Sequence, residues 1–308
     1  MNWPENVQIK EVGPRDGLQN EKAILSTEDK IHWINQMSRS GLKYIEVSSF
    51  VNPQWIPALS DSLEVAKGIE RVPGITYAAL VPNLRGLDKA IEANIDEVSV
   101  FMSSSETHNQ KNINKSIGDT FPVLKEVVQE AQMAGKTVRG YISTVFGCPY
   151  EGQVSINNVI QVADKLLEMG IDELSLGDTI GAASPKQVQL VLENLLKRYP
   201  IERFALHFHD TRGTALANVL MSLEMGMTAF DSSAGGLGGC PYAPGASGNV
   251  ATEDLIYMLH QMGIQTGINR DEQLATAQFI QEKIGRILPS RNLQACTGKS
   301  ALVVKEGE

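Results

Sequence analysis

Two histidines separated by one residue are the clearest candidates for chemistry in this 308-residue chain. His207 and His209 lie in the stretch Ala-Leu-His-Phe-His-Asp-Thr, whose apolar residues suit a β-strand. Alternate residues of a strand project to the same face, so both imidazoles point to one side. Two imidazoles at the end of a strand form half of a divalent-metal site. The alternative is a pair of unrelated histidines, one of them in the core, but the Asp-Thr and glycine that follow favour a metal site.

A carboxylate far away in the sequence could complete this site. Asp16 and its neighbour Arg15 lie shortly after the β-branched stretch Val7–Val12, in the turn that begins Gly13-Pro14. Together with two imidazoles it gives a mixed set of hard and borderline ligands, which suits Mg²⁺ or Mn²⁺. The alternative for Arg15 and Asp16 is a surface ion pair in a turn, and the residue types alone leave both interpretations open.

The elements that must position these residues are eight short β-branched runs that alternate with longer amphipathic patterns. The expected strands are Val7–Val12, Tyr44–Ser48, Thr76–Val81, Glu97–Phe101, Thr137–Ile142, Glu173–Leu176, Phe204–Phe208 and Thr228–Asp231. The expected helices are Thr27–Ser40, Asp61–Glu70, Leu84–Ala93, Ile117–Ala134, Ile156–Met169, Pro185–Arg198, Ala215–Met225 and Thr252–Met262.

Eight β/α units predict an α/β fold, a TIM (β/α)₈ barrel with an additional C-terminal helical segment. A doubly wound open sheet is the alternative, but no G-x-G-x-x-G follows the first strand. We expect residues 1–308 to form a single catalytic TIM-barrel domain, in which about 268–308 form a helix, Asp271–Ile287, and a polar tail.

A barrel places catalytic groups at the carboxyl ends of its strands. Polar clusters fall at seven of these ends, and their convergence on one rim is the signal for a site. The clusters are Arg15-Asp16, Glu46 with Ser48-Ser49, Pro82-Asn83, Ser103–Glu106, Gly177–Thr179, His207–Asp210 and Gly235–Asn249.

Composition narrows the possible functions. Hydrophobic residues make up 42% of the chain and charged residues 20%, which is ordinary for a soluble globular protein. No apolar run is long enough to span a bilayer, so no membrane association is expected. The net charge of −9 argues against nucleic-acid binding. The N-terminus shows no secretory signal, and three cysteines suit no disulfide framework, so a cytoplasmic location is expected.

Two loops each contain a cysteine followed by Pro-Tyr. The stretch Gly235–Asn249 contains six glycines and Cys240, and it is read as a mobile lid with a reactive thiol. A simple connector is the alternative. Cys148, in the loop Gly147–Gly152, is a rival for the reactive thiol, whereas Cys296 near the tail is assigned no catalytic role.

Taken together, these stretches resemble the 3-hydroxy-3-methylglutaryl-CoA lyase family of metal-dependent TIM-barrel lyases. The resemblance runs from about Val7 to about Gly267, and its most specific part is the Gly-Leu-Gly-Gly-Cys-Pro-Tyr loop. Phe208 and Arg212 are modest departures that put no catalytic role in doubt. The motifs that carry the resemblance are Gly13–Glu21, Gly147–Gly152, Ser175–Thr179, His207–Asp210 and Gly235–Asn249.

The resemblance implies a divalent-cation-dependent lyase, with Mg²⁺ or Mn²⁺, that cleaves 3-hydroxy-3-methylglutaryl-CoA to acetyl-CoA and acetoacetate by a retro-Claisen step. Such an activity serves leucine degradation or ketone-body metabolism. The partner is then a small-molecule acyl-CoA substrate, and a homodimer is expected.

The resemblance also assigns roles to individual residues. The metal ligands are Asp16, His207, His209 and Asn249. Arg15 donates to the thioester carbonyl, and Cys240 is the general acid that protonates the enolate carbon. His207 and Asp16 are both candidate bases. Glu46 and Asp178 orient Arg15 and the ligands, and the residues assigned to the substrate carboxylate are Ser49, Ser175 and Thr179.

Two other classes of function stay open on the sequence. A synthase that runs the condensation direction would carry a further regulatory region, whereas only about one helix follows residue 268. A non-catalytic binding module on a barrel is the other class, and the intact set of ligands, arginine and thiol argues against it.

Overall fold

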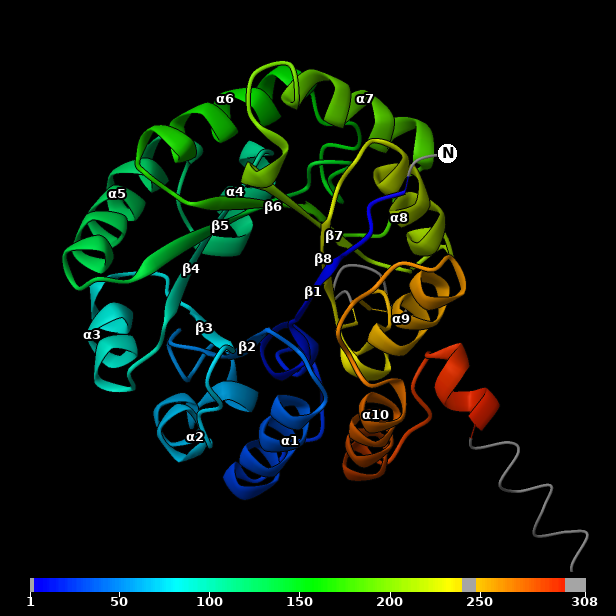
Figure 1. The fold of residues 1–308 in the computed structure, drawn as a ribbon. Helices are drawn as coiled ribbons and strands as arrows, with labels where there is room; N and C mark the ends of the chain where they lie inside the picture. The colour runs from blue at the N-terminus through cyan, green and yellow to red at the C-terminus, as the bar shows by residue number, and fades with distance from the viewer. Residues whose placement is uncertain (1–2, 240–247, 297–308) are drawn as a thin grey trace, which may run out of the picture.

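Parallel strands close into a barrel in the computed structural model, which describes residues 3–239 and 248–296. The strands are hydrogen-bonded in sequence order, β1 to β8, and β1 also pairs with β8 (Figure 1). The strands are β1 Gln8–Glu11, β2 Tyr44–Ser49, β3 Thr76–Leu80, β4 Glu97–Ser103, β5 Thr137–Ser143, β6 Glu173–Asp178, β7 Phe204–Phe208 and β8 Ala229–Ser232. All eight expected strands are present, and the predicted TIM-barrel class is confirmed.

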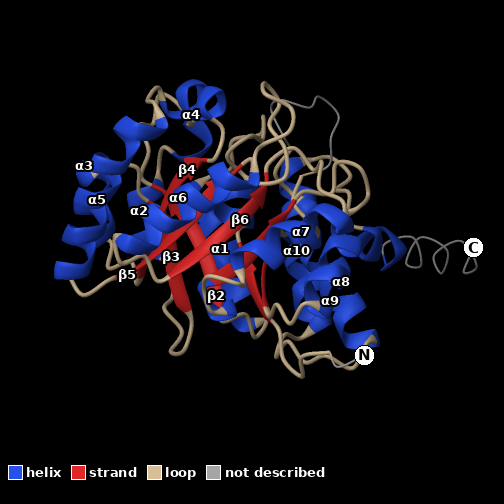
Figure 2. Cartoon of the chain, turned by 90° about the horizontal axis from the view of Figure 1, so that it is seen from above, coloured by secondary structure: helices blue, strands red, loops and turns tan. Residues whose placement is uncertain are grey.

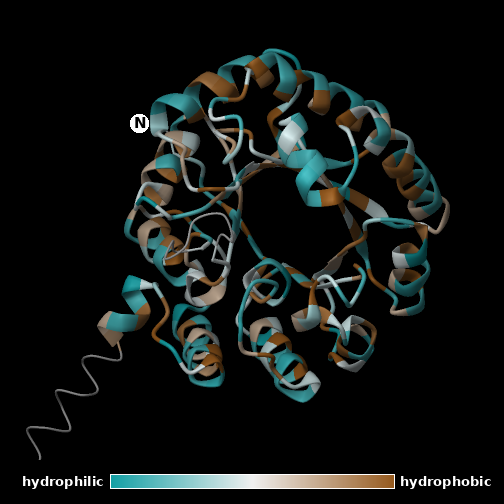
Figure 3. Cartoon of the chain, turned by 180° about the vertical axis from the view of Figure 1, so that it is seen from behind, coloured by the Kyte–Doolittle hydropathy of each residue, from teal (hydrophilic) through white to brown (hydrophobic). Residues whose placement is uncertain are grey.

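The helices form a ring outside the barrel (Figures 1 and 3). They are α1 Thr27–Arg39, α2 Ser62–Gly68, α3 Leu84–Glu92, α4 Glu106–Ile113, α5 Ile117–Met133, α6 Ile156–Glu168, α7 Pro185–Leu195, α8 Ala215–Glu224, α9 Thr252–Gln261 and α10 Arg270–Ile284. Figure 3 shows hydrophobic and hydrophilic stretches alternating along these helices, as expected of helices that bury one face.

Helix α10 fills the place between α9 and α1, where the ring closes (Figure 1). The indole nitrogen of Trp33, on α1, donates to the carbonyl of Thr276 on α10 at 3.0 Å. The amide of Asn269, which caps α10, donates to the carbonyl of Ser40 at 2.7 Å. The expected C-terminal helix is therefore a part of the barrel's outer layer.

Helix α4 and a short π-helical turn, η1 Gly13–Gly17, were not expected from the sequence. Helix α4 lies above the strands in Figure 2, on the side where long loops gather. Its polar composition hides it from a search for apolar periodicity, but Ser105 caps it by accepting a hydrogen bond from the amide of His108. Within the described residues, no helix is both long and apolar enough to cross a membrane.

Candidate metal centre and active site

Three side chains from opposite ends of the chain meet at the carboxyl end of the barrel. The His207 and His209 Nε2 atoms lie 3.2 Å apart. Each lies close to Oδ2 of Asp16, at 3.9 Å from His207 and 3.8 Å from His209. All three residues are buried. They form a cluster of the kind that holds a metal ion, and they are the three ligands predicted from the strand ends.

The π-helical turn η1 presents Asp16 to this cluster. The carbonyl of Val12, at the end of β1, accepts hydrogen bonds from the amides of Arg15, Asp16 and Gly17. Pro14 occupies the first turn, where its missing N–H costs nothing. Gly13 is required because a Cβ there would lie 2.6 Å from Oε1 of Glu11.

Asn249 is held beside the histidines by the backbone. It forms an isolated antiparallel bridge with His209. Its Nδ2 donates to Oδ2 of Asp16 at 2.8 Å, while its Oδ1 is buried and has no hydrogen-bond partner among the described residues. Gly238 and Gly248 allow this approach, because a Cβ on Gly238 would lie 2.4 Å from Asn249 Nδ2 and one on Gly248 would meet the Gly238 backbone at 2.3 Å.

The chemistry of these four residues fits a divalent cation. Burial and the neighbouring His207 lower the pKa of His209 to about 4, so its imidazole is neutral and able to donate a lone pair. Burial alone would raise the pKa of Asp16, but Arg15 and the histidines outweigh it and lower the pKa. Two imidazoles, a carboxylate and an unpaired amide oxygen are a suitable set for Mg²⁺ or Mn²⁺.

Arg15 is the cation of the site and is held on two sides. Its Nε donates to Oε2 of Glu46 and its Nη1 donates to Oδ1 of Asp16, both at 2.6 Å. Its Nη2 has no hydrogen-bond partner in the described part of the chain. Burial alone would lower the pKa of Arg15, but Glu46 and Asp16 reverse the effect and raise the pKa. The guanidinium is therefore fixed and charged, with one donor edge left for a ligand.

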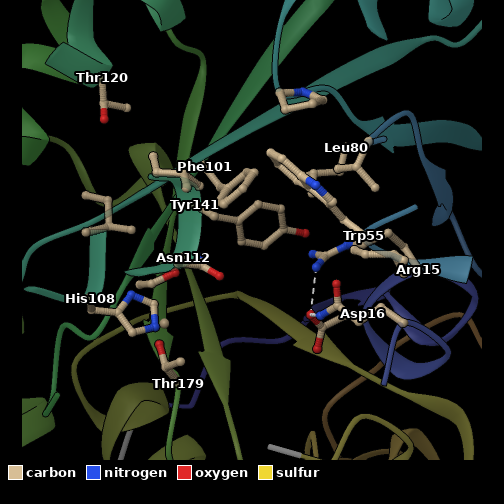
Figure 4. Close-up of a pocket in the computed structure, with 18 of the residues that line it drawn as sticks. Arg15, Asp16, Trp55, Leu80, Phe101, His108, Asn112, Thr120, Tyr141 and Thr179 are labelled. Carbon is tan, nitrogen blue, oxygen red and sulfur yellow. Dashed lines mark hydrogen bonds and ion pairs between the residues drawn. The ribbon is translucent and has the colours of Figure 1, made fainter. Parts of the chain in front are cut away.

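A cavity of about 570 Å³ opens beside Arg15 and the metal cluster. In Figure 4, Arg15 and Asp16 lie on one side of this cavity and His108 and Thr179 on the other, with Tyr141 between them. Apolar side chains line part of its wall, among them Trp55, Leu80, Phe101, Val123 and Leu124. Polar side chains line the rest, including the cluster itself, His108 and Asn112. A mixed lining of this kind is typical of a small-molecule site.

The comparison with protein families decides where the chain belongs. The model of the HMGL-like family matches residues 6–280, which is most of the chain. The chain belongs to the HMGL-like family. The hydroxymethylglutaryl-CoA lyase of Bacillus subtilis is 63% identical over 294 residues, covering 96% of this chain and 98% of that protein. The human mitochondrial hydroxymethylglutaryl-CoA lyase is 49% identical over 292 residues, covering 95% and 90%.

Solved structures agree with this HMGL-like assignment. The crystal structure of the Bacillus subtilis HMG-CoA lyase superposes with a TM-score of 0.96 at 63% identity, covering 96% of this chain and all of that one. An HMG-CoA lyase from Acinetobacter baumannii, solved in complex with coenzyme A and 3-methylmalate, gives a TM-score of 0.91 at 41% identity and covers 96% of both chains.

The other predicted site residues of this HMGL-like chain divide into two groups. Glu46 holds Arg15, as predicted, and Thr179 lines the cavity. Asp178 holds the loop after β6 by accepting hydrogen bonds from the amides of Ala182 and Ala183, and burial raises its pKa to about 6. Among the described residues its hydrogen bonds are to that loop, so its geometry supports a role in shaping the rim of the barrel.

Ser49 and Ser175 do not line the large cavity. Ser175 is fully buried inside the barrel, where its hydroxyl donates to Oδ2 of Asp231 at 2.8 Å. Ser49 is also buried and lines a smaller, separate cavity of about 90 Å³. The predicted contact of these two serines with the substrate carboxylate stays a prediction.

The two rival cysteines are also separated. Cys240 lies outside the described residues, so its predicted role as general acid stays a prediction. Cys148 is buried, and its Sγ lies 3.0 Å from Oγ of Ser105 and accepts hydrogen bonds from the amides of Tyr150 and Glu151. It is absent from the walls of the described cavity. This arrangement indicates that Cys148 ties the loop after β5 to the N-terminal cap of α4.

Two buried carboxyl groups, those of Glu11 and Glu253, hold the loops that form part of the site. Oε1 of Glu11, at the end of β1, accepts hydrogen bonds from the amides of Gly13 at 2.8 Å and Ala234 at 2.9 Å. Glu253, on α9, accepts from the amide of Gly235 at 3.0 Å. Burial raises the pKa of Glu11 to about 7, and burial together with the nearby Glu11 raises the pKa of Glu253 to about 8. The pair fixes the loops after β1 and β8 against each other.

Several functional contacts were missed on the sequence. Tyr141, on β5, stacks on the guanidinium of Arg15 at 4.9 Å and donates to Oε2 of Glu46 at 3.1 Å. Arg139, two residues earlier, is fully buried and contacts both Tyr141 and Asp231. A charged residue inside a buried strand is rare unless it is paired, and this signal could have pointed to Arg139 and Asp231.

Proposed function

We propose that this protein is a divalent-metal-dependent carbon–carbon lyase that cleaves 3-hydroxy-3-methylglutaryl-CoA to acetyl-CoA and acetoacetate. The observation that carries the proposal is the meeting of Asp16, His207 and His209 with Arg15 in the wall of one cavity. The names of the close relatives, and the coenzyme A in the Acinetobacter structure, point to the same substrate class.

The cation site is assigned to Asp16, His207, His209 and Asn249. A divalent cation bound there supplies Lewis acidity toward the tertiary hydroxyl of the substrate and charge to hold its free carboxylate. The donor set suits Mg²⁺ or Mn²⁺, and we propose one of these as the native ion. The buried, unpaired Oδ1 of Asn249 supports its inclusion.

The bond-breaking step needs a proton acceptor and a place for negative charge. A base removes the proton of the C3 hydroxyl, the C2–C3 bond breaks, and the electron pair moves into the thioester to form an enolate. His207 and Asp16 both line the cavity and stay the two candidate bases, although each is also assigned to the cation. Nη2 of Arg15 donates to the thioester oxygen, where the charge develops, as an oxyanion donor does.

The enolate carbon must then take up a proton to form acetyl-CoA. We assign this proton transfer to the thiol of Cys240, whose reference pKa of about 8.5 suits donation near neutral pH. The predicted contacts for the substrate carboxylate are Ser49, Ser175 and Thr179, of which Thr179 lies on the cavity wall. The apolar walls, with Trp55 and Phe101, would accommodate the long pantetheine arm of the acyl-CoA.

The predictions of a single catalytic domain, a homodimer and a cytoplasmic location are kept as part of this proposal. The absence of nucleic-acid binding rests on the net charge of −9. The role in leucine degradation or ketone-body metabolism follows only from the proposed reaction.

The proposal is tested by measuring acetoacetate and acetyl-CoA released from 3-hydroxy-3-methylglutaryl-CoA. We expect the two products in equal amounts, loss of activity after treatment with a chelator, and recovery with Mg²⁺ or Mn²⁺. The metal-loaded protein is also offered longer 3-hydroxyacyl-CoA analogues, and acetyl-CoA with a keto acid to detect a synthase. Cleavage that persists undiminished in metal-free protein, or condensation without cleavage, would contradict the proposal.

A further inference from the structure

Asp231, at the carboxyl end of β8, lies beneath the metal cluster and contacts one of its histidines. Its Oδ2 lies 3.1 Å from Nδ1 of His207, on the side of the imidazole ring away from Asp16. The ring's other nitrogen, Nε2, is the atom that faces His209 and Asp16. Asp231 is fully buried and was assigned no role by the sequence.

The carboxylate of Asp231 is itself held in place by side chains from two other strands. Arg139, on β5, donates to Oδ1 through Nη2 at 2.7 Å and to Oδ2 through Nη1 at 3.2 Å. Ser175, on β6, donates to Oδ2 at 2.8 Å. A guanidinium fork that holds both oxygens is the usual partner of a carboxylate, so Arg139 keeps this group in one orientation.

An ionised carboxylate can only accept hydrogen bonds, so its partner nitrogen on a neutral imidazole must carry the proton. We propose that Asp231 is a positioning residue that fixes His207 in the tautomer protonated on Nδ1 and thereby presents the lone pair of Nε2 to a divalent cation. Orientation of a ligand histidine by a carboxylate behind it is a general means of tuning metal sites.

His209 provides an internal contrast. Its Nδ1 is buried and has no hydrogen-bond partner in the described part of the chain. Nothing comparable among the described residues fixes its tautomer before a metal binds. We therefore expect the tautomer of His207 to be fixed before a metal binds, and that of His209 to be determined by metal binding.

Replacement of Asp231 by asparagine makes a specific prediction. Arg139 donates to Oδ1 at 2.7 Å but to Oδ2 only at 3.2 Å, so the amide oxygen of the new side chain should take the place of Oδ1 and its NH₂ group should face His207. Nδ1 of His207 would then become the acceptor, and the proton would move to Nε2, where it blocks metal binding. Asp231→Asn should therefore invert the tautomer and lower the affinity for Mn²⁺ by about 10- to 100-fold.

Glu173→Gln is the matched control. Glu173 accepts from Nε of Arg139 at 2.7 Å and from Nζ of Lys10 at 2.7 Å, on the far side of the same guanidinium. The variant removes one partly buried negative charge from the same network without touching His207. A purely structural role for the network predicts similar losses in both variants. The proposal predicts a loss of Mn²⁺ affinity in Asp231→Asn alone.

The experiment uses the full chain labelled with ¹⁵N-histidine, free of metal, at mildly alkaline pH. Long-range ¹H–¹⁵N spectra report which ring nitrogen of each of the 5 histidines carries the proton. His207→Gln and His209→Gln variants assign the two signals. We expect His207 to be protonated on Nδ1 in the wild-type protein and on Nε2 in Asp231→Asn, and Mn²⁺ titration followed by electron paramagnetic resonance gives the affinities.

The spectrum of the wild-type protein is by itself a test of the proposal. The test therefore stays decisive even if the Asp231→Asn variant does not fold. A His207 protonated on Nε2 in the metal-free wild-type protein would refute the proposal, and so would equal losses of Mn²⁺ affinity in Asp231→Asn and Glu173→Gln. The inference rests on the proposed metal site. Its readouts need no turnover, so failure of the lyase assay would leave the tautomer result standing.

Discussion

Arg15 shows how one side chain is prepared for chemistry by its neighbours. Glu46 and Asp16 hold two of its nitrogens, and Tyr141 covers its face. Arg15→Lys keeps the charge but loses the planar fork, so the donor to the thioester oxygen is misplaced. We expect kcat to fall by roughly 10²–10³-fold with little change in KM, measured in steady-state cleavage assays. A large increase in KM with a normal kcat would show that Arg15 only binds substrate.

His209 is expected to be a direct metal ligand. His209→Ala removes one of two imidazoles and should lower Mn²⁺ affinity by at least about 10- to 100-fold, the loss typical of residues that only support a ligand. His260→Ala is the control, because His260 is an exposed residue of α9 that contacts Thr266. Unchanged Mn²⁺ affinity in His209→Ala, measured by equilibrium titration, would remove this residue from the site.

The two loop cysteines should behave differently. Cys240→Ser should stop protonation of the enolate, so kcat falls while KM and metal uptake stay nearly unchanged. Cys148→Ser should keep turnover near normal, because the buried Sγ of Cys148 serves the loop and the α4 cap. Both variants are assayed at saturating metal. A dead Cys148→Ser with an active Cys240→Ser would assign the acid to the loop after β5.

At the scale of elements, the glycine-rich loop brings the backbone at Gly238 close to Asn249, the residue proposed to bind the metal. Gly238 has a φ of +110°, and a Cβ there would meet Asn249 Nδ2 at 2.4 Å. Gly238→Ala is therefore strained and displaces Asn249, so we expect weaker Mn²⁺ binding and lower activity. Gly74→Ala is a control for positive φ alone, because Gly74, at φ +83°, has open space around its Cβ position. Equal Mn²⁺ affinity in both variants would contradict this account.

The elements themselves were largely predictable, because short β-branched runs and amphipathic repeats are local patterns. All eight strands were expected, and β7, Phe204–Phe208, has the predicted bounds. Helix α4 was not predicted because its surface is polar on most sides, and a π-helical turn has no periodic signal. The metal cluster was predictable because parallel strands bring their carboxyl ends to one rim.

The supporting contacts were not predictable from local patterns. Asp231 and Ser175 meet across 56 positions of sequence, and Glu11 meets Ala234 across 223. Such pairings depend on which inward-facing side chains share a layer of the barrel. That information lies in the register of the strands and not in any one segment. For the same reason, the hydrogen bond from the Ser175 hydroxyl to Asp231 was not expected from the segment that contains Ser175.

At the scale of the whole molecule, the carboxyl pair of Glu11 and Glu253 links pH to stability. Both folded-state pKa values are raised above the ordinary value of 4.5, to about 7 and about 8. The folded protein therefore retains protons that the unfolded chain releases. This contribution to stability is fully present below about pH 4.5 and is lost as the pH rises to about 8.

Glu253→Gln should flatten this dependence, because it removes one titrating group and the repulsion it exerts on Glu11. We expect the difference in stability between pH 5 and pH 8 to shrink by on the order of a few kcal/mol, given about 1.36 kcal/mol per unit of pKa shift. Urea unfolding at several pH values measures it. Glu64→Gln, at an exposed position of α2, should leave the wild-type slope intact. An equally steep slope in Glu253→Gln would contradict the assignment.

The closure of the barrel between β1 and β8 also sets an order of events during synthesis of the chain. Asp16 emerges from the ribosome early, but the amide of Asn249 that contacts it follows 233 positions later. His207 and His209 also appear only with β7 and the residue that follows it. The nascent chain therefore cannot assemble a complete cation site until nearly all of the barrel has been made. We expect metal binding to follow translation. The bound ion would then link the loop after β1 to the end of β7 and to the loop after β8, and would stabilise the closed barrel.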